Sequence, residues 1–292
     1  MKKLFYLLII LLFANCGNRS NHSKNQQKMP FSFQFDLTKP TKIYELPPIL
    51  KEISGLGFND QNELACIQDE DGFVFFYNLE KAEISDKVLF RKAGDYEGVE
   101  FVDDLVYVLK SNGTIYEIEN LGKDNQKITD YDTGLKKDND AEGLCYDKKN
   151  NCLLIACKEN AGFNGEEIKN QKSVFAFDLA TKELVKNPAL IITDDEIYDF
   201  IKQQDLKNLA FDFNKKIRFK PSGIAVKDGF YYIIASIGNM MLIVNNNSEI
   251  QHIVAIPKDI LPKPEGIAFD KNGLLFLASE GEKGNGVICV FE

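Results

Sequence analysis

The sequence predicts an all-β fold, a β-propeller of five four-stranded blades. A short motif occurs five times in the 292 residues, reading Glu or Ser, Gly, an aliphatic residue, any residue, then an aromatic residue or Val. Its glycines are separated by 43, 45, 80 and 43 residues, and they are Gly55, Gly98, Gly143, Gly223 and Gly266. Each copy is followed by short runs rich in Ile, Val, Phe and Tyr, between turns of Gly, Asn and Asp. A repeat of about 40–50 residues built from short strands is typical of a propeller.

The first fifteen residues have the features of an export signal rather than of a folded element. Lys2 and Lys3 precede the apolar run 4–13, which is too short to span a bilayer by itself. Small or polar residues then lead to Cys16 at a distance that resembles the lipobox of bacterial lipoproteins. This resemblance implies cleavage before Cys16 and acylation of its thiol. The alternative is an ordinary secretory signal with an incidental cysteine.

A lipid anchor at Cys16 would hold the protein stably at a membrane of the bacterial envelope, because several acyl chains bind far better than one. Gly17 is not the Asp that marks retention in the inner membrane of some bacteria, so we expect the outer membrane. Residues 16–30 are rich in Ser, Asn, Gln and Lys and are predicted to form a disordered tether. Residues 31–292 are expected to form one propeller domain.

The strands of each blade can be placed between the turns. The first unit is expected at 55–58, 63–68, 73–78 and 84–90, and the second at 98–101, 105–110, 113–119 and 127–133. The third is expected at 143–147, 152–157, 173–178 and 189–193, and the fourth at 223–226, 230–235, 240–244 and 250–256. The fifth has three strands before the chain stops, at 266–269, 274–278 and 286–291. The spare strand 42–46 is expected to complete it, so that the ring closes by pairing the two ends of the chain.

The spacing of 80 residues between the third and fourth glycines indicates additional structural elements in this interval. We expect a loop insertion at 160–171 and a polar helix at 194–205, which Thr193 and Glu196 would open as a capping box. The alternative is a degenerate sixth blade within this interval.

The motif also predicts where a functional site lies. The first strand of a propeller blade lines the central channel, so the residue before each glycine should lie at one mouth of that channel. These five residues are Ser54, Glu97, Glu142, Ser222 and Glu265. The residues expected to contact a ligand on this face are Ser54, Ser222, Lys220, Lys263 and Glu280.

Three glutamates converging in a partly buried mouth would repel one another unless they are neutralised. Oxygen ligands without His or Cys favour Ca²⁺, or Mg²⁺ as the second choice. The metal ligands expected are Glu97, Glu142, Glu265 and Asp140. The alternative is that the glutamates bond to backbone amides and hold the blades together.

Several classes of function find no support. The chain has 44 acidic against 35 basic residues, which argues against nucleic acid as a partner. Its two histidines, His22 and His252, fall in the tether and on an outer strand, so no Ser-His or Cys-His pair is expected at the channel. The absence of a CxxC motif and of a Cys/His cluster argues against zinc.

Three copies of the motif, in 96–101, 220–226 and 263–269, together with Ala278-Ser279-Glu280-Gly281, resemble the SdiA-regulated family of bacterial envelope propellers. The resemblance implies the fold and an envelope location, but it implies no settled activity. More distantly, the pattern is similar to phytase-like calcium-dependent phosphatases and to lactonases of the gluconolactonase type.

Two functions from different classes follow. One is a binding or scaffold lipoprotein that recognises a protein or a small molecule with the channel face. The other is a metal-dependent hydrolase, in which a channel cation polarises a phosphate ester or lactone and a glutamate such as Glu142 acts as base. Basic residues near the mouth could hold an anionic substrate, or they could pair with the glutamates: Lys110, Lys158, Lys220 and Lys263.

Overall fold

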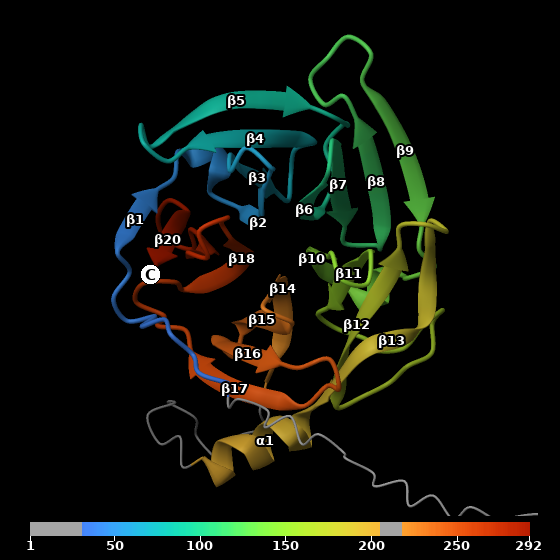
Figure 1. Cartoon of the computed structure of the whole chain (residues 1–292), viewed down its shortest axis with the longest axis vertical. Helices are drawn as coiled ribbons and strands as arrows, with labels where there is room; N and C mark the ends of the chain where they lie inside the picture. The colour runs from blue at the N-terminus through green and yellow to red at the C-terminus, as the bar shows by residue number, and fades with distance from the viewer. Residues whose placement is uncertain (1–30, 205–217) are drawn as a thin grey trace, which may run out of the picture. The chain divides into compact units, whose positions relative to one another are not determined.

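The structure is a computed structural model, and it describes residues 31–204 and 218–292. The expected signal segment, the lipidation site Cys16 and the tether lie outside the described residues. Residues Phe33–Glu292 form one compact unit of five four-stranded antiparallel sheets set around a central axis (Figure 1). The five-blade prediction is confirmed, and the described residues form no sixth blade. Within them no helix is both long and apolar enough to cross a membrane.

The blades follow one another along the chain, and in blades one to four the strands pair in sequence order. Blade one holds β2 (Ile53–Phe58), β3 (Leu64–Gln68), β4 (Phe73–Asn78) and β5 (Glu83–Leu89), and blade two holds β6 (Tyr96–Val102), β7 (Leu105–Lys110), β8 (Thr114–Glu119) and β9 (Lys127–Asp132). Blade three holds β10 (Ala141–Asp147), β11 (Cys152–Cys157), β12 (Gln171–Asp178) and β13 (Glu183–Thr193), and blade four holds β14 (Lys220–Lys227), β15 (Phe230–Ile237), β16 (Met240–Val244) and β17 (Ile250–Ala255). Blade five holds β18 (Lys263–Phe269), β19 (Leu275–Glu280), β20 (Val287–Phe291) and β1 (Lys42–Glu45).

The core lies between neighbouring blades rather than within one sheet. The inner strands are buried on both faces, as β19 illustrates with every residue buried, whereas the outermost strand β5 is mostly exposed. Phe75 of blade one and Phe276 of blade five share one buried cluster, so adjacent sheets pack face to face. Burial of apolar surface between the sheets therefore sets the positions of the first strands at the axis.

The ring closes as the sequence predicts. β1 pairs antiparallel with β20, from Lys42 opposite Val290 to Glu45 opposite Val287, and so supplies the fourth strand of blade five. The Tyr44 hydroxyl donates to the carbonyl oxygen of Leu79 at 2.9 Å, which ties the closing strand to blade one.

The residues before β1 cross the face opposite the predicted channel mouth. Phe33 stacks on His252 of β17 with ring centroids 5.2 Å apart. Phe35 packs on Phe269, the last residue of β18, with centroids 6.0 Å apart. β18 begins at Lys263 on the mouth side and ends at Phe269, so this arm lies at the other end of the strand.

The long interval between the third and fourth glycines holds the predicted loop and helix. Residues 158–170 connect β11 to β12, and α1 (Asp194–Gln203) begins with the capping box of Thr193 and Glu196. Ile197 and Ile201 pack it against the cluster shared by blades three and four. β13 begins at Glu183, six residues earlier than expected, because the pairing with β12 shifts between Val174 and Ala176 and then resumes.

Candidate functional site

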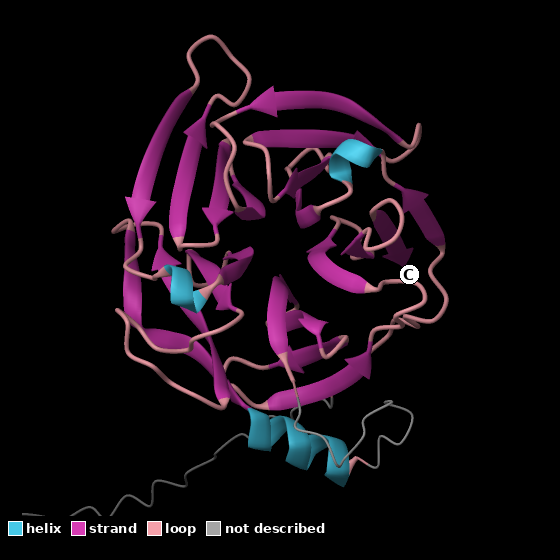
Figure 2. Cartoon of the chain, turned by 180° about the vertical axis from the view of Figure 1, so that it is seen from behind, coloured by secondary structure: helices cyan, strands magenta, loops and turns pink. Residues whose placement is uncertain are grey.

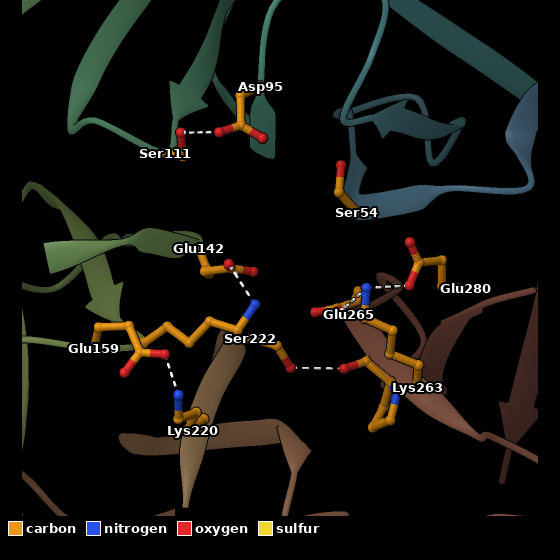
Figure 3. Close-up of polar contacts among 12 residues, drawn as sticks. Ser54, Asp95, Ser111, Glu142, Glu159, Lys220, Ser222, Lys263, Glu265 and Glu280 are labelled. Atoms are coloured by element: carbon orange, nitrogen blue, oxygen red, sulfur yellow. Dashed lines mark hydrogen bonds and ion pairs between the residues drawn. The ribbon is translucent and has the colours of Figure 1, made fainter. Parts of the chain in front are cut away.

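A β-bulge recurs at the same motif position in all five blades. In every pair of first and second strands the register shifts, and the residue before the motif glycine has no partner across the ladder. A bulge turns a side chain out of the regular ladder, and here it directs each one to the axis. These residues, all buried, are Ser54, Glu97, Glu142, Ser222 and Glu265. The structure therefore brings these residues together at the channel mouth, and Figure 3 shows Ser54, Glu142, Ser222 and Glu265.

The glycines that follow the bulges let neighbouring blades touch at the axis. A Cβ atom on Gly98 would lie 2.5 Å from Cβ of Leu144, and one on Gly223 would lie 2.9 Å from the carbonyl oxygen of Glu265. Both distances are shorter than any ordinary contact. Four of the bulge residues, Ser54, Glu97, Glu142 and Glu265, line an axial cavity of about 10 Å³ together with the five glycines. This is about the room that one water molecule requires.

The two serines of the ring bind the backbone of the next blade. Ser54 Oγ donates to the carbonyl oxygen of Tyr96 at 2.7 Å, and Ser222 Oγ donates to that of Pro264 at 2.6 Å. Each acceptor belongs to the residue just before the next bulge. The sequence analysis predicted that both serines contact a ligand. In the structure their hydroxyl protons are used in hydrogen bonds between neighbouring blades.

Lysines contact two of the three ring glutamates. Lys158, in the loop after β11, places Nζ 2.7 Å from Glu142 Oε1, and both side chains are largely buried. Lys263 Nζ lies 3.2 Å from Glu265 Oε1 and also pairs with Glu280 (Figure 3). The sequence left two roles open for these lysines, which were binding an anionic substrate and pairing with the glutamates. In the structure Lys158 and Lys263 pair with glutamates.

Glu97 is neutralised differently, by holding a proton. Burial raises its pKa to about 11, with repulsion from Glu142 and Asp95 and a side-chain hydrogen bond to Asp95 acting in the same direction. Asp95 in turn accepts a hydrogen bond from Ser111 Oγ. At neutral pH Glu97 is therefore a carboxylic acid, with Asp95 as its hydrogen-bond partner.

The remaining two glutamates are also less acidic than usual. Burial raises the pKa of Glu142 to about 8, with repulsion from Glu265, against the attraction of Lys158. Burial likewise raises the pKa of Glu265, against Lys158 and Lys263. Glu265 Oε2 is buried and accepts no hydrogen bond from the described residues. The ring thus keeps one buried carboxyl oxygen without a hydrogen-bond partner among the described residues, beside two more carboxyl groups.

The other predicted site residues lie outside the axial cavity. Asp140 precedes the bulge of blade three with φ of 53° and is not among the described residues that line the cavity. Lys220 forms an ion pair with Glu159 at the start of blade four. Glu280 belongs to a separate acidic cluster with Glu52 and Asp69, whose oxygens lie within 4.8 Å of one another.

The Glu52 member of that cluster was missed by the sequence analysis, because it lies outside the motif and only the fold brings it to Glu280. Burial raises the pKa of Glu280 to about 7 and that of Asp69 to about 6, and hydrogen bonding to Glu280 lowers the pKa of Glu52. Asp69 and Glu280 are therefore less acidic than ordinary carboxyl groups, whereas Glu52 is more acidic.

Known structures with similar folds are propellers of varied function, at low sequence identity. A glutaminyl cyclase of Myxococcus xanthus aligns with a TM-score of 0.55 and 13% identity, over 87% of this chain and 96% of that one. A gluconolactonase of Xanthomonas campestris aligns with a TM-score of 0.52 and 10% identity, over 82% and 72%. A PQQ-bound aldose sugar dehydrogenase of Streptomyces coelicolor aligns with a TM-score of 0.50 and 13% identity, over 87% and 97%. At these identities the likeness concerns the fold alone.

Sequence comparison gives a more specific result. No curated protein matches the chain significantly. The family model described as SdiA-regulated matches residues 32–283, nearly the whole propeller. This agrees with the resemblance carried by the motif copies and by Ala278-Ser279-Glu280-Gly281. The chain belongs to the SdiA-regulated family.

Proposed function

We propose that the protein is a lipid-anchored binding or scaffold protein of the bacterial envelope, and that its axial ring holds one divalent cation. Ca²⁺ is the first choice and Mg²⁺ the second, because the ring offers oxygen atoms only. The ligands would be Glu97, Glu142 and Glu265, whose oxygens would have to move closer together on binding, because among the described residues it is Glu52, Asp69 and Glu280 that bring three carboxylate oxygens within 4.8 Å of one another. Asp140, expected as a fourth ligand, is left out because it does not line the axial cavity.

The observation that carries this proposal is the unpartnered oxygen Glu265 Oε2. A buried carboxylate oxygen without a partner costs free energy of about 1–3 kcal/mol or more. It lies in a ring whose cavity is about the size of one water or ion, beside Glu97 and Glu142. A cation at this position would satisfy the oxygen and remove the repulsion among the three carboxyl groups.

The protons held by the ring glutamates predict how cation binding depends on pH. Glu97 and, below about pH 8, Glu142 are protonated in the folded protein, so a cation has to displace protons before carboxylate oxygens can coordinate it. We therefore expect the affinity for Ca²⁺ to rise with pH, and protons to be released on binding.

The test is thermal unfolding of the full chain in EDTA and in millimolar Ca²⁺ or Mg²⁺. A cation that binds only the folded state stabilises it by about 2.7 kcal/mol at a hundredfold excess over Kd, which corresponds to about 5–11 °C in Tm. Glu97→Gln and Glu265→Gln should lose this response, whereas the exposed control Glu167→Gln should keep it. An unmoved wild-type midpoint would leave the glutamates as structural contacts between blades.

The anchor is tested separately. Cys16→Ser should move the protein from the membrane fraction to the soluble envelope fraction. A variant that still sediments with membranes would overturn the lipid anchor, and would leave the cation proposal unaffected. The anchored protein's partner would be an unidentified protein or small molecule that docks on the mouth face.

Hydrolysis is the second candidate, favoured by the hydrogen-bonded pair of Asp95 and protonated Glu97, which resembles an acid–base pair. The axial cavity has no room for a phosphate ester or lactone, and this supports binding over hydrolysis. Calcium-dependent turnover of p-nitrophenyl phosphate or gluconolactone that Glu97→Gln abolishes would reverse that preference.

A further inference from the structure

A second cavity lies on the mouth face, away from the axis. It is a cleft of about 710 Å³ between the loop that follows β11 and the start of β14. Its volume is in the range of about 300–1,000 Å³ that small-molecule sites occupy. The buried ring of Phe219 belongs to its lining, and most other lining side chains are charged or amides. Figure 2 shows the face of the propeller on which this loop lies.

The acidic groups of the cleft are mostly engaged. Glu159 pairs with Lys220, and Glu167 pairs with Lys169 at 2.9 Å with both side chains exposed. Asp194 has an interaction partner of its own. Asp138 is the remaining acid of the lining. Most of the negative charge is therefore already compensated before any ligand enters.

Two cationic groups are not compensated in this way. The exposed guanidinium of Arg218 forms no ion pair or hydrogen bond with the described residues. Lys172 is half-buried, and its Nζ donates to the carbonyl oxygens of Lys158 at 2.6 Å and of Glu159 at 2.8 Å. An ammonium group has three donors, so one remains for a ligand. Burial lowers the pKa of Lys172, and repulsion from Lys220 acts in the same direction.

We propose that this cleft binds a small organic anion, whose carboxylate or phosphate group lies between Arg218 and Lys172. Arg218 can donate two parallel hydrogen bonds to such a group, and Lys172 adds a third donor and a second positive charge. The polar walls, which include the carboxylate of Asp138, suit a body that carries hydroxyl groups. The class is therefore an acidic or phosphorylated sugar. This inference does not depend on a cation in the axial ring.

The experiment is isothermal titration calorimetry on the full chain with three probes: galacturonate, glucose 6-phosphate and neutral glucose. We expect at least one of the two anions to bind at least tenfold more tightly than glucose, and the two anions separate a carboxylate site from a phosphate site. Arg218→Gln and Lys172→Gln should each weaken that binding about tenfold or more. Arg218 is exposed, so its substitution tests the site without risk to the fold.

Two control variants test whether the effect on anion binding is specific to Arg218 and Lys172. Lys169→Gln removes a lining charge whose side chain is 73% exposed and already paired, and it should bind the anion as the wild type does. Glu97→Gln should also leave the anion affinity unchanged, which separates this cleft from the axial ring. The proposal is overturned if no probe binds below 10 mM, if glucose binds as tightly as both anions, or if Arg218→Gln binds like the wild type.

Discussion

Lys158→Met tests whether lysines, rather than only protons or metal ions, hold the axial ring together. The substitution keeps an unbranched side chain and removes the ammonium group 2.7 Å from Glu142 Oε1. The same ammonium also attracts Glu265. We expect the variant to fold with the same blades and with a loss of stability that depends on pH.

The magnitude follows from the state of Glu142. Its folded-state pKa of about 8 lies above its ordinary value of 4.5, so its contribution to stability is present at low pH and is lost as pH rises from about 4.5 to about 8. Without Lys158 the folded pKa rises further, and the loss continues above pH 8. At pH 6 the cost is that of one hydrogen bond to a charged group, about 1.5–3 kcal/mol. At pH 9 the cost in unfolding free energy grows by up to about 1.4 kcal/mol more, which is the free energy that corresponds to a pKa difference of one.

The assay is urea unfolding at pH 6 and pH 9, in EDTA, with the free energy extrapolated to water. The double variant Lys158→Met/Glu142→Gln has no carboxyl group at this position and should lose the pH-dependent part of the penalty. A penalty that is equal at both pH values, or that still grows with pH in the double variant, would refute the assignment of Lys158 as the counter-charge of Glu142.

Two further predictions concern the architecture around the ring. Gly98→Ala should cost about 3 kcal/mol, because its Cβ would meet Cβ of Leu144 at 2.5 Å; a fall in Tm of about 6–12 °C by calorimetry would be the result. Gly284→Ala is the matched control, since no described atom lies within 4 Å of its added Cβ, and equal effects of the two would contradict the close approach of blades. Deleting residues 31–46 should expose the edge of β20 and cause aggregation in size-exclusion chromatography, whereas a monomer of unchanged Tm would speak against closure by β1.

The fold could be predicted because its repeat is a local property of the chain. Each motif glycine marks a position where two blades come close, and at Gly98, Gly223 and Gly266 an added Cβ would lie less than 3.0 Å from an atom of the neighbouring blade. The same local requirement in each blade makes the repeat visible in the sequence. The closure of the ring could be predicted by counting strands, because blade five lacked one strand and the predicted strand 42–46 belonged to no other blade. The predicted strand began at 189, whereas β13 begins at Glu183 and carries Asn187 and Pro188 within the irregular part of its pairing with β12.

The site was predictable in position but not in chemistry. The shared bulge places three carboxyl groups at the axis, and the motif alone indicates that. The counter-charges of two of them are Lys158, which reaches Glu142 from a loop sixteen residues later, and Lys263, which lies between Glu265 and Glu280. Neither distance is encoded in a local pattern. The cleft at Arg218 likewise exists only because the loop after β11 folds back toward blade four.

The arm before β1 has a consequence for access to the two proposed sites. Phe33 packs on His252, and Phe35 packs on Phe269 at the end of β18 opposite the axial ring. The described part of this arm therefore leaves the mouth of the ring and the Arg218 cleft uncovered. A ligand can reach either site without displacing the arm, so closure of the propeller by β1 adds no cost to binding.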